Sequence, residues 1–216
     1  MSLLVAIGVN EEGYREVLAV EAAGSEKKES YRNLLKGLIE RGLHGVQLVI
    51  SDDHSAIQAA VGAELPGAQW QRCVVHFTRN ILARVARSEM KAVAEDLKPI
   101  FAVAKESTAR RLAEEFAQRH RKVFPKAVET LEQGLDDALT YLAFPSSHYR
   151  FIRTTNPLER LFKEVKRRTR VVGVFPGEES AVSLCTAVLL RTTEAWSLRR
   201  YMDMEPLNAM NSNPQN

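Results

Sequence analysis

The chain has 216 residues, of which 45% are hydrophobic and 26% charged, which is enough for one sizeable domain with a buried core and excludes an intrinsically disordered chain. Its first residues lack a basic segment and their apolar run is too short for a signal peptide or a spanning helix, so we expect a cytoplasmic protein without a membrane partner. The net charge is only +3, but residues 150–170 contain eight basic and two acidic residues, so the positive charge is concentrated there.

The first part of the chain predicts two strands, a helix and a third strand. Residues 3–9 and 14–22 are short apolar runs separated by a polar turn, which is typical of a β-hairpin. Residues 25–41 carry apolar side chains at helical spacing, and Gly42 follows as a C-terminal cap, so this segment predicts an amphipathic helix. Residues 46–50 form a continuous β-branched run, the pattern of a strand buried on both faces.

The middle of the chain then changes from strands to helices. Residues 54–62 predict a short helix, and residues 69–75 predict a strand or the passage from a strand into a helix. From residue 77 to about 148 the sequence is rich in helix formers with helical apolar spacing, as at Leu97, Ile100, Phe101 and Ala104, which predicts a helical insertion. The order of these elements indicates an α/β fold.

Two further helices are expected near the C-terminus. In the first, Asn156 suits the N-cap and Glu159 the third position of a capping box. Its buried stripe is expected to contain Leu158, Leu161, Phe162 and Val165. The second spans residues 178–196, and the polar residues 208–216 are expected to be a disordered tail.

Asp52 follows the predicted strand at residues 46–50 directly. Ligands of α/β proteins gather at the carboxyl ends of strands, and phosphoryl transfer on DNA commonly uses two divalent ions held by a few carboxylates. Magnesium and manganese prefer such oxygen ligands. Asp52 also fits a plain turn or cap, and Asp53 and His54 fit exposed turn residues or caps of the next helix.

Glu159 is the second candidate carboxylate, although its position in a capping box explains it without a metal ion. On a helix it shares one face with Phe162, Lys163 and Lys166. The cations around it fit either a solvated helix face or a surface that contacts DNA phosphates, which dominate non-specific DNA affinity. The candidates for such contacts are Arg153, Arg160, Lys163, Lys166, Arg167, Arg168 and Arg170.

Cys73 and His76 have the spacing of half a zinc site. A second ligand pair is absent from the sequence, so we do not expect structural zinc. A nucleophilic Cys73 activated by His76 is not expected either, because residues three apart in a strand-to-helix turn rarely reach the required geometry. We expect a buried thiol and a hydrogen-bonded histidine, and with no secretory signal Cys73 and Cys185 are expected to be reduced.

Four stretches resemble successive motifs of Mutator-type bacterial insertion-sequence DDE transposases. They are VAIGVNEEGYREVLAV, VISDDHSAI, AQWQRCVVHFTRNIL and TTNPLERLFKEVKRRTRVVGVFP, they occur in the family's order, and they cover nearly the whole chain. The resemblance implies an RNase H-like mixed sheet with a helical insertion. It therefore implies an incomplete RNase H-like DDE catalytic domain at residues 1–207, with the insertion at about 77–148.

The resemblance also implies roles for particular residues. The family's second metal-binding aspartate falls on Asp52 and its glutamate on Glu159, with Glu164 as the alternative if the helix is in a different register. Trp70, Cys73, His76 and Asn156 belong to the shared motifs. The complete family site implies two Mg²⁺ or Mn²⁺ ions, and the implied partners are DNA, as transposon ends and target, and a second copy in a homodimer.

The family's first aspartate has no counterpart in this sequence, because no aspartate precedes Asp52. The resemblance thus implies DNA transposition by strand cleavage and strand transfer, but in a copy that is truncated at its N-terminus, lacks the first strand of the sheet and is inactive. Two alternatives stay open. One is a DNA-binding regulatory remnant, and the other is an RNase H-like nuclease or resolvase whose third carboxylate is Asp136 or Asp137.

Overall fold

The computed structural model describes residues 2–24, 27–172, 175 and 177–212. The chain divides into two compact units, each assembled from segments that are distant in the sequence. Unit 1 consists of Met1–Gln47, His54–Ala68 and Asn156–Asn216, and unit 2 of Leu48–Asp53 and Gln69–Thr155. No helix in these described ranges is long and apolar enough to cross a lipid bilayer.

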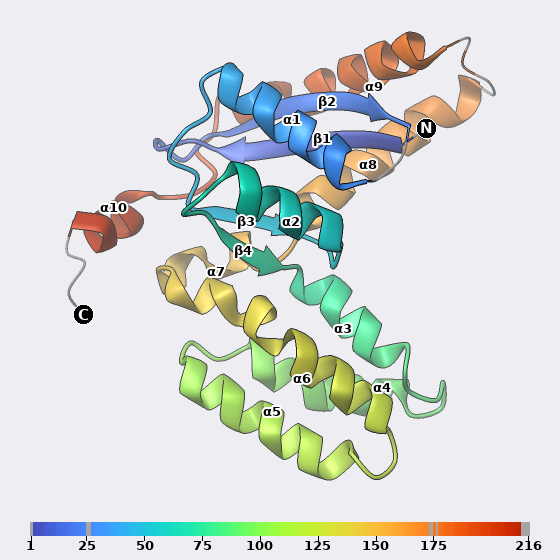
Figure 1. The fold of residues 1–216 in the computed structure, drawn as a ribbon, viewed down its shortest axis with the longest axis vertical. Helices are drawn as coiled ribbons and strands as arrows, with labels where there is room; N and C mark the ends of the chain where they lie inside the picture. Colours follow the sequence, from blue (N-terminus) through green and yellow to red (C-terminus); the bar gives the residue numbers. More distant parts are fainter. Residues whose placement is uncertain (1, 25–26, 173–174, 176, 213–216) are drawn as a thin grey trace. The chain divides into compact units, whose positions relative to one another are not determined.

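Unit 1 begins with the predicted β-hairpin. Strands β1 (Ser2–Val9) and β2 (Arg15–Ala23) pair antiparallel (Figure 1). In the turn, the side-chain oxygen of Asn10 accepts hydrogen bonds from two backbone N–H groups at 3.1 and 2.9 Å. Gly13 has a φ of 88°, a conformation that favours glycine. The polar turn between the two apolar runs is therefore fixed by an asparagine and a glycine.

Helices cover both faces of the hairpin (Figure 1). Helix α1 (Lys28–Glu40) lies on one face, and helices α8 (Asn156–Thr169) and α9 (Glu178–Thr193) lie on the other. Side chains of β1 alternate between the two clusters, as expected for a strand buried on both sides. The α1 cluster includes Leu4, Ala6, Leu34 and Leu38, and the α8–α9 cluster includes Leu3, Val5, Ile7, Leu161, Val165 and Leu189.

The predicted first two helices of the chain are confirmed. Gly42 has a φ of 102° and donates its N–H to the carbonyl of Ile39 at 2.9 Å, so it terminates α1 as predicted. Helix α2 (Ser55–Glu64) packs beside α1. Arg32 of α1 donates its Nε–H to Glu64 of α2 at 2.6 Å, which links the two helices.

The C-terminal segment of unit 1 returns to the hairpin. Helix α9 is followed by the 3-10 turn η5 (Glu194–Trp196), and Arg15 of β2 lies between the rings of Trp196 and Tyr201, at 4.1 and 3.8 Å from their centroids. Helix α10 covers Glu205–Ser212, so residues 208–212 are helical where a disordered tail was expected. The last four residues of that expected tail, 213–216, lie outside the described residues.

Unit 2 contains a parallel pair of strands. Strand β3 (Leu48–Ser51) pairs with β4 (Gln69–Arg72), and Ser51 is the partner of Arg72. The strands of the described residues thus form two separate two-stranded sheets, where one mixed sheet was expected. No described strand pairs with the remaining edges of either sheet. The α/β class is confirmed, with helices predominating.

The rest of unit 2 is helical. Helices begin at Val74, three residues before the predicted start of the insertion. Ile100 and Phe101 lie in a 3-10 turn, because Pro99 interrupts the helix that their spacing had predicted. The elements are α3 (Val74–Leu82), α4 (Met90–Leu97), η1 (Lys98–Phe101), α5 (Glu106–His120), α6 (Pro125–Leu139), η2 (Thr140–Ala143), η3 (Ser146–His148) and α7 (Tyr149–Ile152).

A buried glutamine joins β4 to the helices of unit 2. Gln71 is fully buried, and its Nε2 donates to the carbonyl of Ala138 at 2.9 Å. Its Oε1 accepts the backbone N–H of Tyr141 at 2.7 Å. Both ends of the side-chain amide are therefore satisfied, as burial of a polar group requires. The strand pair is in this way fixed to the end of α6 and to η2.

We expect Gly134→Ala to destabilise the chain. A Cβ at Gly134 of α6 would lie 2.7 Å from Phe77 and would also collide with the guanidinium of Arg72. Overpacking of this kind lowers the free energy of unfolding by about 1–3 kcal/mol, which urea denaturation followed by circular dichroism would measure. Gly62→Ala in α2 is the matched control, since nothing lies within 4 Å of its Cβ position, and it is expected to stabilise by about 0.4–1 kcal/mol. Equal stability of the two variants would contradict this packing.

Candidate functional site

The carboxyl ends of β3 and β4 lie side by side. Hydrogen bonding continues past the strands, because the N–H of Cys73 donates to the carbonyl of Ser51 at 2.7 Å. Trp70 of β4 donates its Nε1–H to the hydroxyl of Ser51 at 2.9 Å, and that hydroxyl donates to the carbonyl of Asp52 at 2.9 Å. The motif residue Trp70 therefore has a definite role. It fixes the residue that precedes Asp52.

Asp52 and Asp53 differ although they are adjacent. Both are exposed. The carboxylate of Asp52 makes no hydrogen bond or ion pair with any residue that the structure describes, whereas Asp53 forms an ion pair with Arg72. An exposed carboxylate at the end of a parallel strand is open to a cation from solvent. Of the two aspartates, Asp52 is thus the one that remains available.

Arg72 was missed in the sequence, and it is the main polar feature of this region. Its side chain is only 8% exposed, and the guanidinium carbon lies 4.4 Å from the centroid of the Phe77 ring. Asp137 of α6 is nearby: burial raises the pKa of its carboxyl group, and the charge of Arg72 opposes that rise. The sequence did contain a signal for this residue, because Arg72 is a charged residue within a predicted strand. In unit 2 that position is buried.

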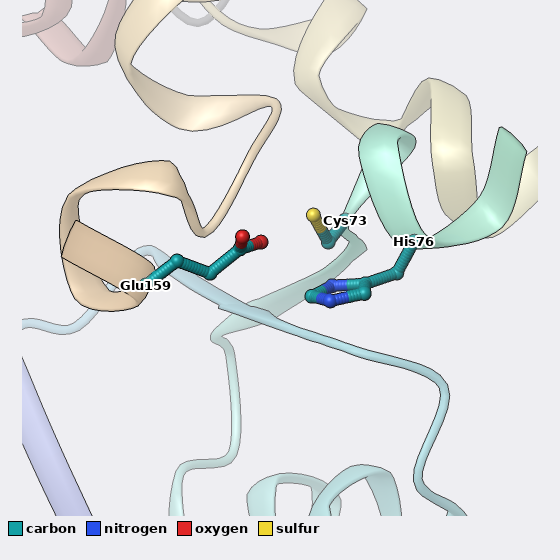
Figure 2. A group of neighbouring side chains, drawn as sticks. All are labelled: Cys73, His76 and Glu159. Carbon is teal, nitrogen blue, oxygen red and sulfur yellow. The ribbon is translucent and has the colours of Figure 1, made fainter. Parts of the chain in front are cut away.

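Cys73 and His76 lie at the start of α3, as Figure 2 shows. The buried sulfur of Cys73 accepts hydrogen bonds from the backbone N–H and the hydroxyl of Thr155, both at 3.3 Å. The half-buried His76 has a ring nitrogen within 4.8 Å of that sulfur. No other histidine or cysteine of the described residues joins this pair. Two such donors are half of a structural zinc set.

Glu159, also labelled in Figure 2, is half-buried in the first turn of α8 and belongs to unit 1, whereas Asp52 belongs to unit 2.

Helix α8 departs from its prediction in two places. It begins at Asn156, so this residue is the first residue of the helix and not the N-cap that was predicted. Leu161 and Val165 are buried as predicted. Phe162 was predicted to be buried but is 36% exposed, because the stripe that meets α9 and the hairpin is narrower than expected.

The cations of α8 and of the turn that follows it fall into two groups. Arg167 and Arg168 both donate to Glu164, at 2.6 and 2.8 Å, and these hydrogen bonds lower the pKa of Glu164 to about 2. Glu164 is therefore an ion-pair partner of two arginines. The second group is exposed without an ion pair to any described residue. It comprises Arg160, Lys163, Lys166 and Arg170.

Two other predicted residues have partners within unit 2. Arg153 donates from Nη1 to the carbonyl of Phe101 at 2.7 Å, so its guanidinium is engaged in the packing of this unit. Asp136 forms an exposed ion pair with Arg110 at 2.7 Å. Asp137, the other acidic residue considered for a third carboxylate in the insertion, is in electrostatic contact with Asp53.

Comparison with known proteins agrees with this set of motifs. A family model described as "Transposase, Mutator family" matches residues 1–198. The chain belongs to the Mutator family of transposases. The membership predicted from the four motifs is confirmed, and this family suggests a general dependence on divalent metal ions.

Relatives in the family are named as insertion-sequence transposases. The transposase for insertion sequence element ISRM5 of Rhizobium meliloti is 35% identical over 207 residues, which are 95% of this chain and 52% of that protein. For IS406 of Burkholderia multivorans the identity is 38%, with 95% and 53% covered. For IS256 in transposon Tn4001 of Staphylococcus aureus it is 34%, with 93% and 52% covered. The chain spans about half the length of these relatives.

We expect Glu164→Gln to increase DNA affinity. The substitution releases Arg167 and Arg168 from their shared partner. Two released cations that contact phosphates would steepen the slope of log affinity against log salt by up to about 2, as measured by fluorescence anisotropy with a labelled duplex. Glu179→Gln, which removes an exposed charge from the first turn of α9, is the matched control. An equal gain in both variants would show an effect of net charge alone.

Proposed function

We propose that these residues form the catalytic part of a transposase, which cuts DNA and transfers a strand of an insertion sequence in the cytoplasm. The observation that supports this most is Asp52. In a chain of the Mutator family, it presents an exposed carboxylate at the end of a parallel strand pair, and this carboxylate is unpaired among the residues that the structure describes. Carboxylates in this position are what metal-dependent phosphoryl transfer requires.

We further propose that the fold is RNase H-like over residues 1–207, with the helical insertion at about 77–148. Two features support this proposal. The hairpin β1–β2 is buried on both faces by helices, and β3–β4 is a parallel pair whose connection contains α2. Such elements belong in a larger sheet, because a two-stranded ribbon alone is only marginally stable. Pairing of two copies as a homodimer remains a prediction.

The donor set fits magnesium or manganese. Asp52 in unit 2 and Glu159 in unit 1 are the proposed ligands, and carboxylate oxygens are the donors that these ions prefer. Two bound ions would activate the attacking oxygen and stabilise the leaving one. The neighbouring carboxylates do not compete for them, because Asp53 is held by Arg72 and Glu164 by Arg167 and Arg168.

The exposed cations of α8 and its following turn are proposed to hold DNA phosphates. Arg160 and Lys163 are three residues apart, as are Lys163 and Lys166, so each pair occupies neighbouring positions on the helix surface. Phosphate contacts of this kind give affinity without sequence specificity. A DNA-binding regulator is the second candidate function. The exposed cations of α8 favour it as well, since phosphate binding by this surface does not require Asp52 or Glu159.

The first test uses the purified 216-residue chain and a labelled duplex with magnesium or manganese. We expect salt-dependent binding but no nicking, because these residues supply no aspartate before Asp52. Each phosphate contact removed, by Lys163→Ala or Lys166→Ala, is expected to lower the salt slope by about 1. Lys126→Ala, an exposed cation of α6, is the control. Metal-dependent nicking by this chain alone would overturn the expectation that it is inactive.

The second test asks whether Asp52 and Glu159 serve catalysis. A chimera joins the remaining part of the ISRM5 transposase to this chain, and nicking and joining are measured on ISRM5 ends. We expect activity that Asp52→Asn and Glu159→Gln each abolish and that Glu11→Gln, at the exposed hairpin turn, leaves unchanged. Activity that survives Asp52→Asn would reject the proposed catalytic role. An inactive chimera that still binds DNA would favour the regulator.

A further inference from the structure

We propose that Arg72 is a positioning residue: it anchors Asp53 from the end of β4 and thereby fixes the turn that presents Asp52. The inference rests on the proposed function to the extent that Asp52 is taken as a metal ligand. The position of the turn itself is a separate property, which can be measured without a metal ion.

Arg72 is held in place by its surroundings. The residue is 7% exposed, and a buried guanidinium requires pairing and packing to offset the loss of water. The ring of Phe77 lies against it at 4.4 Å, an arrangement that favours a cation. The absence of a side chain at Gly134 provides its space, since a Cβ there would collide with the guanidinium. Helices α3 and α6 therefore both fix Arg72.

Asp53 is the exposed member of the pair. Its side chain is 49% exposed, against 8% for that of Arg72, and it lies beyond the last residue of β3. An exposed turn that is joined to a buried, packed cation takes its position from the cation. The ion pair of Arg72 with Asp53 therefore acts on the turn and not on the core of unit 2.

Asp52 lies between two residues that β4 holds. On one side, Ser51 pairs with Arg72 in the strand register and accepts the Nε1–H of Trp70 at 2.9 Å. On the other side, Asp53 is bound to the guanidinium of Arg72. Both neighbours are thus fixed while the carboxylate of Asp52 has no partner among the described residues. This is the arrangement expected of a preorganised ligand supported by residues around it.

A simple electrostatic role of Arg72 makes the opposite prediction. If Arg72 acted on a bound cation only through its charge, its removal would strengthen cation binding, because like charges repel. If Arg72 positions the turn, its removal weakens binding. Residues that support a metal ligand typically change affinity by about 10–100-fold when they are substituted. The sign of the change in Arg72→Gln therefore distinguishes the two roles.

The experiment measures Mn²⁺ binding to the 216-residue chain by the electron paramagnetic resonance signal of the free ion. We expect Arg72→Gln and Asp53→Asn each to weaken binding by about 10-fold or more, and the double variant to be no weaker than the worse single one, since both break one interaction. Glu132→Gln, which breaks the exposed ion pair with Arg121, is the matched control and is expected to bind as the wild type does. Tighter binding by Arg72→Gln would overturn the proposal.

Amide hydrogen exchange of the same variants without metal supplies the second measurement. We expect exchange of the Cys73 N–H, which donates to the carbonyl of Ser51 at 2.7 Å beside the turn, to be several-fold faster in Asp53→Asn, with the protection of α3 and α6 retained. We expect Arg72→Lys to restore part of the protection that Arg72→Gln loses. Unchanged exchange of the Cys73 N–H in Asp53→Asn would overturn the positioning role. If Asp52→Asn binds Mn²⁺ as well as the wild type does, the proposed metal role of Asp52 fails, and the exchange data alone decide the role of Arg72.

Discussion

The parallel pairing of β3 with β4 is the constraint on which the candidate site in unit 2 depends. It brings the ends of two segments that are about twenty residues apart in the sequence to one place, so that Ser51 faces Arg72 and the chain continues into Asp52 on one side and Cys73 on the other. The pair is fixed in turn by Gln71, whose buried amide is satisfied by the end of α6 and by η2. A short two-stranded ribbon could not hold these residues by its own hydrogen bonds. The helical insertion therefore has a structural role, because it supplies the packing that keeps the strand ends in register.

Helix α8 combines three kinds of side chain on one short element. Leu161 and Val165 face α9 and the hairpin, and this burial fixes how the helix can rotate about its axis. With the rotation fixed, Glu159 falls at the border of the buried stripe, and the cations fall on the solvent side. The burial of two apolar residues thus determines where an acidic residue and a basic surface are presented. Any change that altered the apolar stripe would move both.

The sequence predicted the local elements well because their signals are local. The hairpin, α1 with its terminal Gly42, and the strand before Asp52 all follow from periodicity and turn residues within a few positions. What it did not reveal depends on contacts distant in the sequence. Arg72 lies in a strand pattern that gives no hint of Phe77 and Gly134 around it, and Phe162 is exposed because the partner surface is narrower than the periodic stripe. The roles of Asp52 and Glu159 came from the resemblance to the family, since each also fits an ordinary cap or turn.

Charge pairing distinguishes the two adjacent aspartates of the VISDD stretch. Asp53 is bound by Arg72, whereas Asp52 makes no ion pair with any residue that the structure describes. In the helical motif, Glu164 is bound by two arginines. A carboxylate that shares its charge with an arginine attracts a metal ion less strongly, and separating the pair is costly where the arginine is buried, as Arg72 is. Motif sequence alone treats adjacent carboxylates as equivalent candidates. The arginines around them make the distinction, and they also hold the backbone on which the remaining aspartate is presented.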